Sequence, residues 1–119
     1  MTFNEYQRSL GGSSYLYANA SNAMKDLLDY IARRSETKTP NIVLPAYIPA
    51  KLYRTALAAG FEVKFYEVFG KCTFDLKQVE GLIDGNTLAV FYVHYFGFPN
   101  QIRELSALTK QKGVYLIED

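Results

Sequence analysis

Short apolar runs rich in β-branched residues alternate along this chain with segments of helical periodicity. The clearest run is TLAVFYVH at residues 87–94, which is typical of an interior strand buried on both faces. Strands that alternate with helices are joined by right-handed crossovers into a parallel sheet. The sequence therefore predicts an α/β fold, a three-layer αβα arrangement with a mostly parallel sheet.

The remaining strands are predicted at residues 41–44, 61–68 and 114–117. The first helix is expected over residues 21–34, with Ser21 or Asn22 as its cap. Its apolar stripe recurs at helical spacing and consists of Met24, Leu27, Leu28 and Ile31.

Proline, aspartate and glycine mark the ends of the other helices. Pro49 suits a first helical turn, and Gly60 stands where a left-handed C-terminal cap is wanted. A short helix is predicted to begin at Asp75, with Gln78 completing a weak capping box. The last helix follows residues 99–100 and ends at Gly113.

The length of 119 residues suits one domain and is short for a two-domain enzyme. Residues 1–20 mix glycine and serine with aromatic residues, which predicts an irregular lead-in. Residues 21–119 are expected to form the α/β domain.

Charge and composition exclude several classes of function. Thirteen basic against twelve acidic residues give a net charge of +1, which disfavours nucleic-acid binding. The single cysteine, Cys72, can form no internal disulfide, and no metal site is expected. The longest apolar run, residues 88–93, is far below the roughly 18 residues of a membrane span. We therefore expect a soluble, cytoplasmic protein.

The carboxyl ends of the predicted strands are where a ligand would bind, because the crevice of an open parallel sheet lies there. Tyr47 follows the first strand, and His94 ends the third. The pair Glu118 and Asp119 follows the last strand. These side chains are expected to meet at one edge of the sheet.

Three motifs at these strand ends resemble the pyridoxal-phosphate (PLP) aminotransferases of the DegT/DnrJ/StrS type, which act mainly on nucleotide-linked keto-sugars. They are VLPAY at residues 43–47, continuing through AAG at 58–60, then VHYFG at 93–97, and ED at 118–119. The likeness covers residues 15–119, and it corresponds to the first third of a typical member. It implies that the chain is the N-terminal part of a PLP-binding domain, truncated at its C-terminus.

The resemblance assigns cofactor contacts to individual residues. Asp119 matches the aspartate that pairs with the pyridine nitrogen of PLP, where a carboxylate keeps that nitrogen protonated. Ala20 and Ser21, with Asn19, stand where the family has S-G-T, a turn that holds the cofactor phosphate at a helix N-terminus. The departure of Asn19 and Ala20 from that motif leaves plain helix capping by Ser21 as an alternative.

Two further residues have open roles. Tyr47 lies near the position of a ring that stacks on the cofactor, but many family members carry this ring two residues later, where this chain has Pro49. A packing role for Tyr47 is the alternative. His94 either supports a residue that contacts the cofactor or is a structural residue. Its aromatic neighbours are interpreted as core or interface residues: Tyr92, Tyr95, Phe96 and Phe98.

In this family the lysine that binds the cofactor covalently lies well beyond the position of Asp119, and no lysine of this chain stands in a matching motif. We therefore expect the chain alone to be inactive and to have no catalytic residue of its own. The intact parent is expected to be a homodimer that transfers an amino group from a donor to a keto-sugar nucleotide. The alternatives are a small flavodoxin-like binding module and a PLP-dependent sugar dehydratase.

Overall fold

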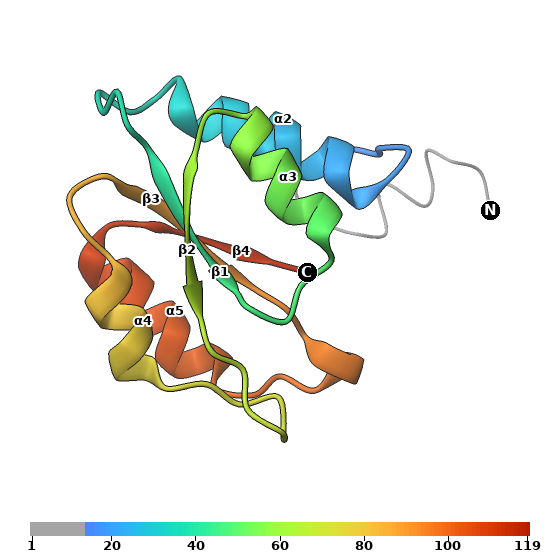
Figure 1. Ribbon diagram of the computed structural model, residues 1–119, viewed down its shortest axis with the longest axis vertical. Helices are drawn as coiled ribbons and strands as arrows, with labels where there is room; N and C mark the ends of the chain where they lie inside the picture. Colours follow the sequence, from blue (N-terminus) through green and yellow to red (C-terminus); the bar gives the residue numbers. More distant parts are fainter. Residues whose placement is uncertain (1–13) are drawn as a thin grey trace.

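The computed structural model describes residues 14–119, which contain a four-stranded parallel sheet (Figure 1). The strands are β1 (Asn41–Pro45), β2 (Glu62–Tyr66), β3 (Thr87–Tyr92) and β4 (Tyr115–Glu118). Their order is β2-β1-β3-β4, and every neighbouring pair is parallel. β3 lies between β1 and β4, so the interior position predicted for this segment is confirmed.

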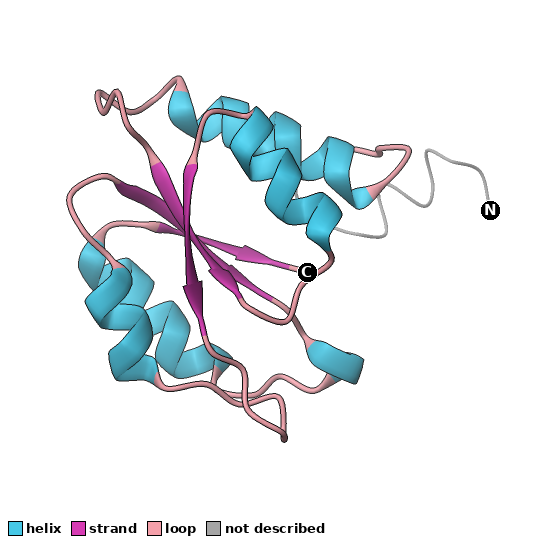
Figure 2. Ribbon diagram, in the orientation of Figure 1, coloured by secondary structure: helices cyan, strands magenta, loops and turns pink. Residues whose placement is uncertain are grey.

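Helices cover both faces of the sheet (Figure 2). On one face lie α2 (Ala20–Ala32) and α3 (Ala50–Ala58), and on the other lie α4 (Leu76–Leu82) and α5 (Ile102–Lys112). The core is accordingly divided into two hydrophobic clusters, one between the sheet and α2/α3 and one between the sheet and α4/α5. The three-layer αβα prediction is confirmed.

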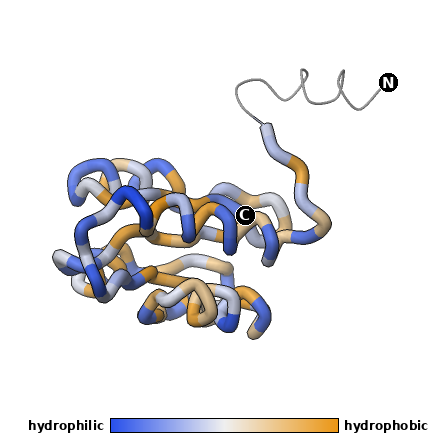
Figure 3. The backbone as a smooth tube through the Cα atoms, turned by 90° about the horizontal axis from the view of Figure 1, so that it is seen from above, coloured by the Kyte–Doolittle hydropathy of each residue, from blue (hydrophilic) through white to orange (hydrophobic). Residues whose placement is uncertain are grey.

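Alternation along β1 explains why the strand is apolar at successive positions. Ile42 and Leu44 belong to the α2/α3 cluster, whereas Val43 between them belongs to the α4/α5 cluster. In Figure 3 the hydrophobic stretches run through the middle of the molecule, and hydrophilic residues gather at the outer turns. Burial on both faces is the property expected of a parallel sheet.

The amino end of α2 differs in detail from the prediction. Asn19 is the cap, and its side-chain oxygen accepts a hydrogen bond from the backbone N–H of Asn22 at 3.1 Å. Ser21 lies in the first turn and is buried rather than capping. Leu27 is 39% exposed, because the helix turns Met24 and Leu28 toward the sheet and leaves Leu27 at its side.

Other predicted boundaries shift by a few residues. Asp75 caps α4 by accepting from the N–H of Lys77 at 2.9 Å, as expected. Gln78 does not complete a capping box, because its side-chain oxygen accepts from the N–H of Glu67 at 2.8 Å. β3 ends at Tyr92 rather than residue 94, since the chain turns there toward the 3₁₀ helix η1 (Tyr95–Gly97).

A hydrogen-bonded network fixes the amino ends of β1 and β3. The Asn41 side chain donates to Asp84 Oδ1 at 2.9 Å and accepts from the Thr87 hydroxyl at 2.6 Å. Lys64 Nζ reaches Asp84 Oδ2 at 2.5 Å. The hydrogen bond from Lys64, followed by those from Asn41 and the Asn86 amide, holds the pKa of Asp84 well below its usual range.

The predicted lead-in lies partly outside the described residues, since the description begins at residue 14. Residues 14–19 form neither helix nor strand, and α2 begins at Ala20. Figure 1 shows the end of β4 on the side of the sheet where α2 begins. This arrangement positions the candidate site.

Candidate functional site

Backbone hydrogen bonds of Asp119 hold the carboxyl ends of β3 and β4 together. The N–H of Asp119 donates to the carbonyl of Tyr92, and the N–H of His94 donates to the carbonyl of Asp119, both at 2.9 Å. Because all strands are parallel, Tyr47, His94 and Asp119 follow strands that end at the same edge of the sheet. The backbone position of Asp119 is therefore fixed by the sheet itself.

Asp119 lines a cavity of about 170 Å³ between the sheet and the amino end of α2. Ala20, the first residue of α2, lines the same cavity, so the fold brings these two sequence-predicted residues together. Glu118, the other member of the acidic pair, also lines the cavity. The remaining lining residues, which the sequence did not single out as site residues, are apolar: Ala23, Met24, Leu27, Leu52, Phe91 and Ile117. The result is a pocket with mostly apolar walls that is also lined by two acidic residues and by the first residue of a helix.

The amino terminus of α2 carries partial positive charge, opposite in sign to the Asp119 carboxylate. The first N–H groups of a helix have no acceptor within the helix, and the helix dipole places partial positive charge there. Asn19 engages the N–H of Asn22 with its side chain, and its carbonyl accepts from the N–H groups of Asn22 and Ala23. The N–H groups of Ala20 and Ser21, which precede these two in the first turn, are therefore the ones at which an anion can bind.

His94 lies on the other face of the sheet. Its ring packs edge-on against Tyr92, at 4.8 Å between centroids, and Tyr92 belongs to the α4/α5 cluster. Its Nε2 is 2.8 Å from Glu118 Oε2. Strand alternation places the Asp119 side chain with Ile117 on the α2/α3 face instead. His94 is thus outside the lining of the cavity and approaches it only through Glu118.

Tyr47 is also outside that lining, at the rim of the sheet. Its ring is 64% exposed and stacks on Tyr95, with centroids 5.4 Å apart and planes 24° from parallel. The Tyr95 hydroxyl donates to the backbone carbonyl of Tyr47 at 2.5 Å. Burial is the main cause that raises the pKa of Tyr95 to about 12. The sequence contained no signal for this pairing, because the two residues come from different loops.

The aromatic residues at the end of β3 and after it differ in burial. Tyr92 is buried, as the core interpretation predicts, and its hydroxyl donates to the carbonyl of Asn100 at 2.7 Å. Phe96 and Phe98 are exposed. Phe96 has a φ of 56°, an uncommon conformation for a large side chain.

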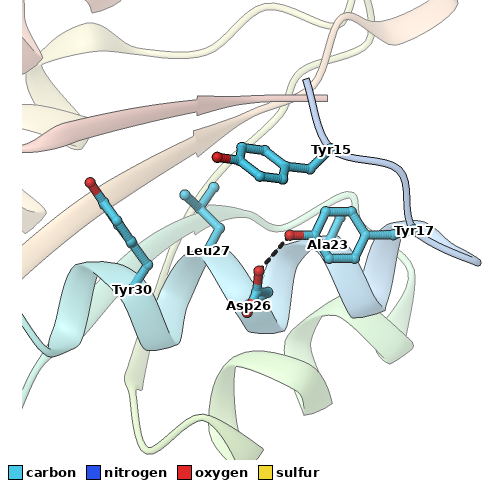
Figure 4. A pocket seen from close by; sticks show the side chains of 6 residues that line it. All are labelled: Tyr15, Tyr17, Ala23, Asp26, Leu27 and Tyr30. Carbon is cyan, nitrogen blue, oxygen red and sulfur yellow. Dashed lines mark hydrogen bonds between the residues drawn. The ribbon is translucent and has the colours of Figure 1, made fainter. Parts of the chain in front are cut away.

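A larger cleft of about 660 Å³ flanks α2 and is lined by Tyr15, Tyr17, Ala23, Asp26, Leu27 and Tyr30 (Figure 4). The Tyr17 hydroxyl donates to an oxygen of the Asp26 carboxylate, as the dashed line in Figure 4 marks. Ala23 and Leu27 are shared with the cavity at Asp119, but the sequence-predicted site residues do not line this cleft. The smaller cavity is therefore the better candidate site.

Two classes of site find no support in the part of the chain that the structure describes. Residues 14–119 contain no group of three or more His, Cys, Asp or Glu side chains that could hold a metal ion. Each helix in the same range is too short or too polar to cross a membrane.

Nearly the whole chain is similar in sequence to known proteins. Residues 16–119 match the model of the DegT/DnrJ/EryC1/StrS aminotransferase family. A curated relative, the GDP-4-keto-6-deoxy-D-mannose 3-dehydratase of Yersinia pseudotuberculosis, is 27% identical over 115 residues. That alignment covers 91% of this chain and 29% of the relative.

Solved structures share the fold. The GDP-4-keto-6-deoxy-D-mannose-3-dehydratase of Escherichia coli, solved with bound hydrated PLP, superposes with a TM-score of 0.72 at 21% identity, over 98% of this chain and 31% of that one. The aspartate aminotransferase of Thermotoga maritima gives a TM-score of 0.64 at 22% identity, over 81% of this chain and 28% of that one. The chain thus spans about three tenths of the length of these relatives.

Proposed function

Because the chain belongs to the DegT/DnrJ/EryC1/StrS aminotransferase family, we propose that Asp119 and the amino end of α2 form part of a site for pyridoxal 5′-phosphate. The observation that carries the proposal is the cavity that Asp119 and Ala20 line together. The Escherichia coli relative, whose structure contains PLP, supports it through a shared fold.

The donor set of the cavity suits this cofactor. PLP carries a phosphate at one end and a basic ring nitrogen at the other, and the cavity is lined both by the first residue of a helix and by the carboxylate residue Asp119. The apolar walls between them suit a planar ring. When bound, PLP supplies a ring that withdraws electrons from the reacting carbon, more strongly when its nitrogen is protonated.

Each residue then has a definite task. Asp119 holds a proton on the ring nitrogen, because a carboxylate beside the nitrogen favours the charged pyridinium. The amides at the start of α2 bind the phosphate, with Ser21 in the same turn. Asp119 is kept in place by its backbone hydrogen bonds to the end of β3.

The described lysines do not line this cavity. Lys25, Lys64 and Lys112 form ion pairs with Asp29, Asp84 and Glu80 elsewhere on the molecule. We propose that the 119-residue chain alone does not transaminate, since the reaction needs a lysine at the cofactor.

For the intact protein we propose amino transfer to a keto-sugar nucleotide, with cytoplasmic location and homodimer formation as expectations from the family. The second candidate is a PLP-dependent sugar dehydratase, which is favoured by the similarity to the GDP-4-keto-6-deoxy-D-mannose 3-dehydratase of Yersinia pseudotuberculosis. The two are separated by mass spectrometry of the products from a nucleotide-linked 4-keto-sugar and glutamate. Transfer gives a nucleotide-linked amino sugar, whereas dehydration gives a nucleotide-linked deoxy-sugar whose sugar ring carries no amino group. The flavodoxin-like alternative is set aside, because the family is established over residues 16–119.

Calorimetric titration tests the cofactor site directly. The ligand is 4′-deoxypyridoxine 5′-phosphate, which lacks the aldehyde that would react with surface lysines. Asp119→Asn is expected to weaken binding about tenfold, the loss of one charge-assisted hydrogen bond. Asp26→Asn is the matched control, because Asp26 lies on α2 outside the cavity lining. Equal affinities for Asp119→Asn and the unmodified chain would contradict the proposal.

A further inference from the structure

The loops after β1 and β3 are joined at the rim of the sheet by one aromatic pair. Tyr95 stacks on the ring of Tyr47 and donates a hydrogen bond to the Tyr47 carbonyl at 2.5 Å. These two contacts act on the ring and on the backbone of the same residue. The position of Tyr47 therefore depends on Tyr95 in two ways.

The Tyr47 loop is anchored on both sides of that residue. The N–H of Ala46 donates to the carbonyl of Tyr66 at 2.8 Å, and Ile48 packs against the α2/α3 cluster. The loop then leads into α3, whose Leu52 lines the cavity at Asp119. The Tyr47 ring projects from this anchored loop and is 64% exposed, so Tyr95 is the contact that sets its orientation.

Tyr95 itself is held by a tight turn. It begins the 3₁₀ helix η1, where the N–H of Gly97 donates to the carbonyl of His94 at 2.8 Å. Gly97 has a φ of 80°, a conformation that favours glycine. The backbone N–H of His94 in turn donates a hydrogen bond to the carbonyl of Asp119 at 2.9 Å. A short chain of contacts thus links the stacked pair to the residue at the centre of the proposed site.

We propose that Tyr95 is a positioning residue that orients the Tyr47 ring, so that the face not covered by Tyr95 stacks on the planar ring of the bound cofactor. The inference rests on the proposed function, since it presumes that the ligand at Asp119 is a planar ring. Tyr95 acts only through Tyr47 and touches neither the cofactor nor the substrate.

A double-mutant cycle tests this dependence. Binding of 4′-deoxypyridoxine 5′-phosphate is measured by calorimetry for Tyr47→Ala, Tyr95→Ala, the double variant and the unmodified chain. Removing the stacking ring with Tyr47→Ala is expected to raise Kd about fivefold to tenfold. Tyr95→Ala is expected to raise it about threefold, and the double variant should equal Tyr47→Ala, because Tyr95 has nothing left to orient.

A conservative variant and a control separate positioning from folding. Tyr95→Phe keeps the stacked ring and loses the hydroxyl, so its Kd is expected to stay within about twofold of the unmodified chain. Tyr115→Ala removes a half-exposed tyrosine at the amino end of β4, away from the rim, and should leave Kd unchanged. If Tyr95→Ala acted through a general loss of folding, the double variant would have a higher Kd than Tyr47→Ala alone.

Ultraviolet titration gives an independent signature. Burial raises the pKa of Tyr95 to about 12, and Tyr47 covers one face of its ring. Tyr47→Ala should therefore move one tyrosine titration toward its ordinary value near 10, and Tyr95→Phe should remove that titration.

The possible failures are distinguishable. If Asp119→Asn weakens binding and Tyr95→Ala does not, the positioning role is wrong and the cofactor site stands. The same conclusion follows if Tyr95→Ala weakens binding equally with and without Tyr47. If Asp119→Asn has no effect, the proposed function itself fails.

Discussion

Asn41→Ala is expected to destabilise the chain by about 2 to 3 kcal/mol. The Asn41 side chain is almost fully buried, and it joins Asp84 at 2.9 Å to the Thr87 hydroxyl at 2.6 Å. A hydrogen bond between neutral groups contributes about 1 kcal/mol net, and one to a charged group about 1.5 to 3 kcal/mol. In Asn41→Ala the Thr87 hydroxyl can still donate to Asp84 Oδ1, which lies at 3.2 Å. The expected loss of stability is therefore at the lower end of the sum of the two hydrogen-bond contributions.

Urea denaturation followed by circular dichroism measures this loss. With a slope of about 1 to 2 kcal/mol per molar urea, the midpoint should fall by about 1 to 3 M. Asn86→Ala is the matched control, because the Asn86 side chain accepts only an exposed hydrogen bond from Thr37 at 2.8 Å. Its cost should stay below about 1 kcal/mol. The reasoning is refuted if Asn41→Ala costs no more than Asn86→Ala.

Three further variants follow from the same structure. Asn19→Ala should lower the free energy of unfolding by about 1 kcal/mol, read from the urea midpoint, because it removes the side-chain cap of α2. The pKa of Asp84 is lowered in the folded chain by Lys64, so this stabilisation is present above the unfolded pKa near 4 and is lost as the pH falls below it. Urea midpoints from pH 6 to 3 should therefore fall less steeply in Asp84→Asn, and parallel curves would contradict the assignment. A Cβ would meet open space at both Gly113 and Gly85, but only Gly113 has a positive φ, at 68°. Gly113→Ala should therefore cost about 1 to 2 kcal/mol in thermal melts, whereas Gly85→Ala should change little.

The order of the secondary structure was predictable because apolar runs and helical stripes are local signals. Residues 87–94 were recognisable as an interior strand from their continuous apolar, β-rich run, and β3 confirms this for residues 87–92. The cap of α2 was not predictable in detail, because Asn19, Ser21 and Asn22 are all good caps and tertiary packing buries Ser21. Gln78 was misassigned for a similar reason, since its partner Glu67 is distant in the sequence.

The candidate site was predictable only in part. Asp119 and Ala20 were identified from motifs, and the fold places them on one cavity. The faces of the sheet were harder to assign, because a strand end does not reveal which side chain points to which layer. His94 therefore lies with Glu118 on the opposite face, and Tyr95 was assigned to core or interface although it pairs with Tyr47. The cofactor roles of all five residues stay predictions: Asp119, Ala20, Ser21, Tyr47 and His94.

The protonation state of a bound pyridine nitrogen tests the central claim most directly, because it reports the contact with Asp119. The measurement is the ¹⁵N chemical shift of ring-labelled 4′-deoxypyridoxine 5′-phosphate, followed from acid to alkaline pH in the bound state. The account predicts that the nitrogen stays protonated to higher pH on the unmodified chain than in the free ligand, and that Asp119→Asn abolishes this difference. Superimposable titrations for the unmodified chain and Asp119→Asn would contradict the account.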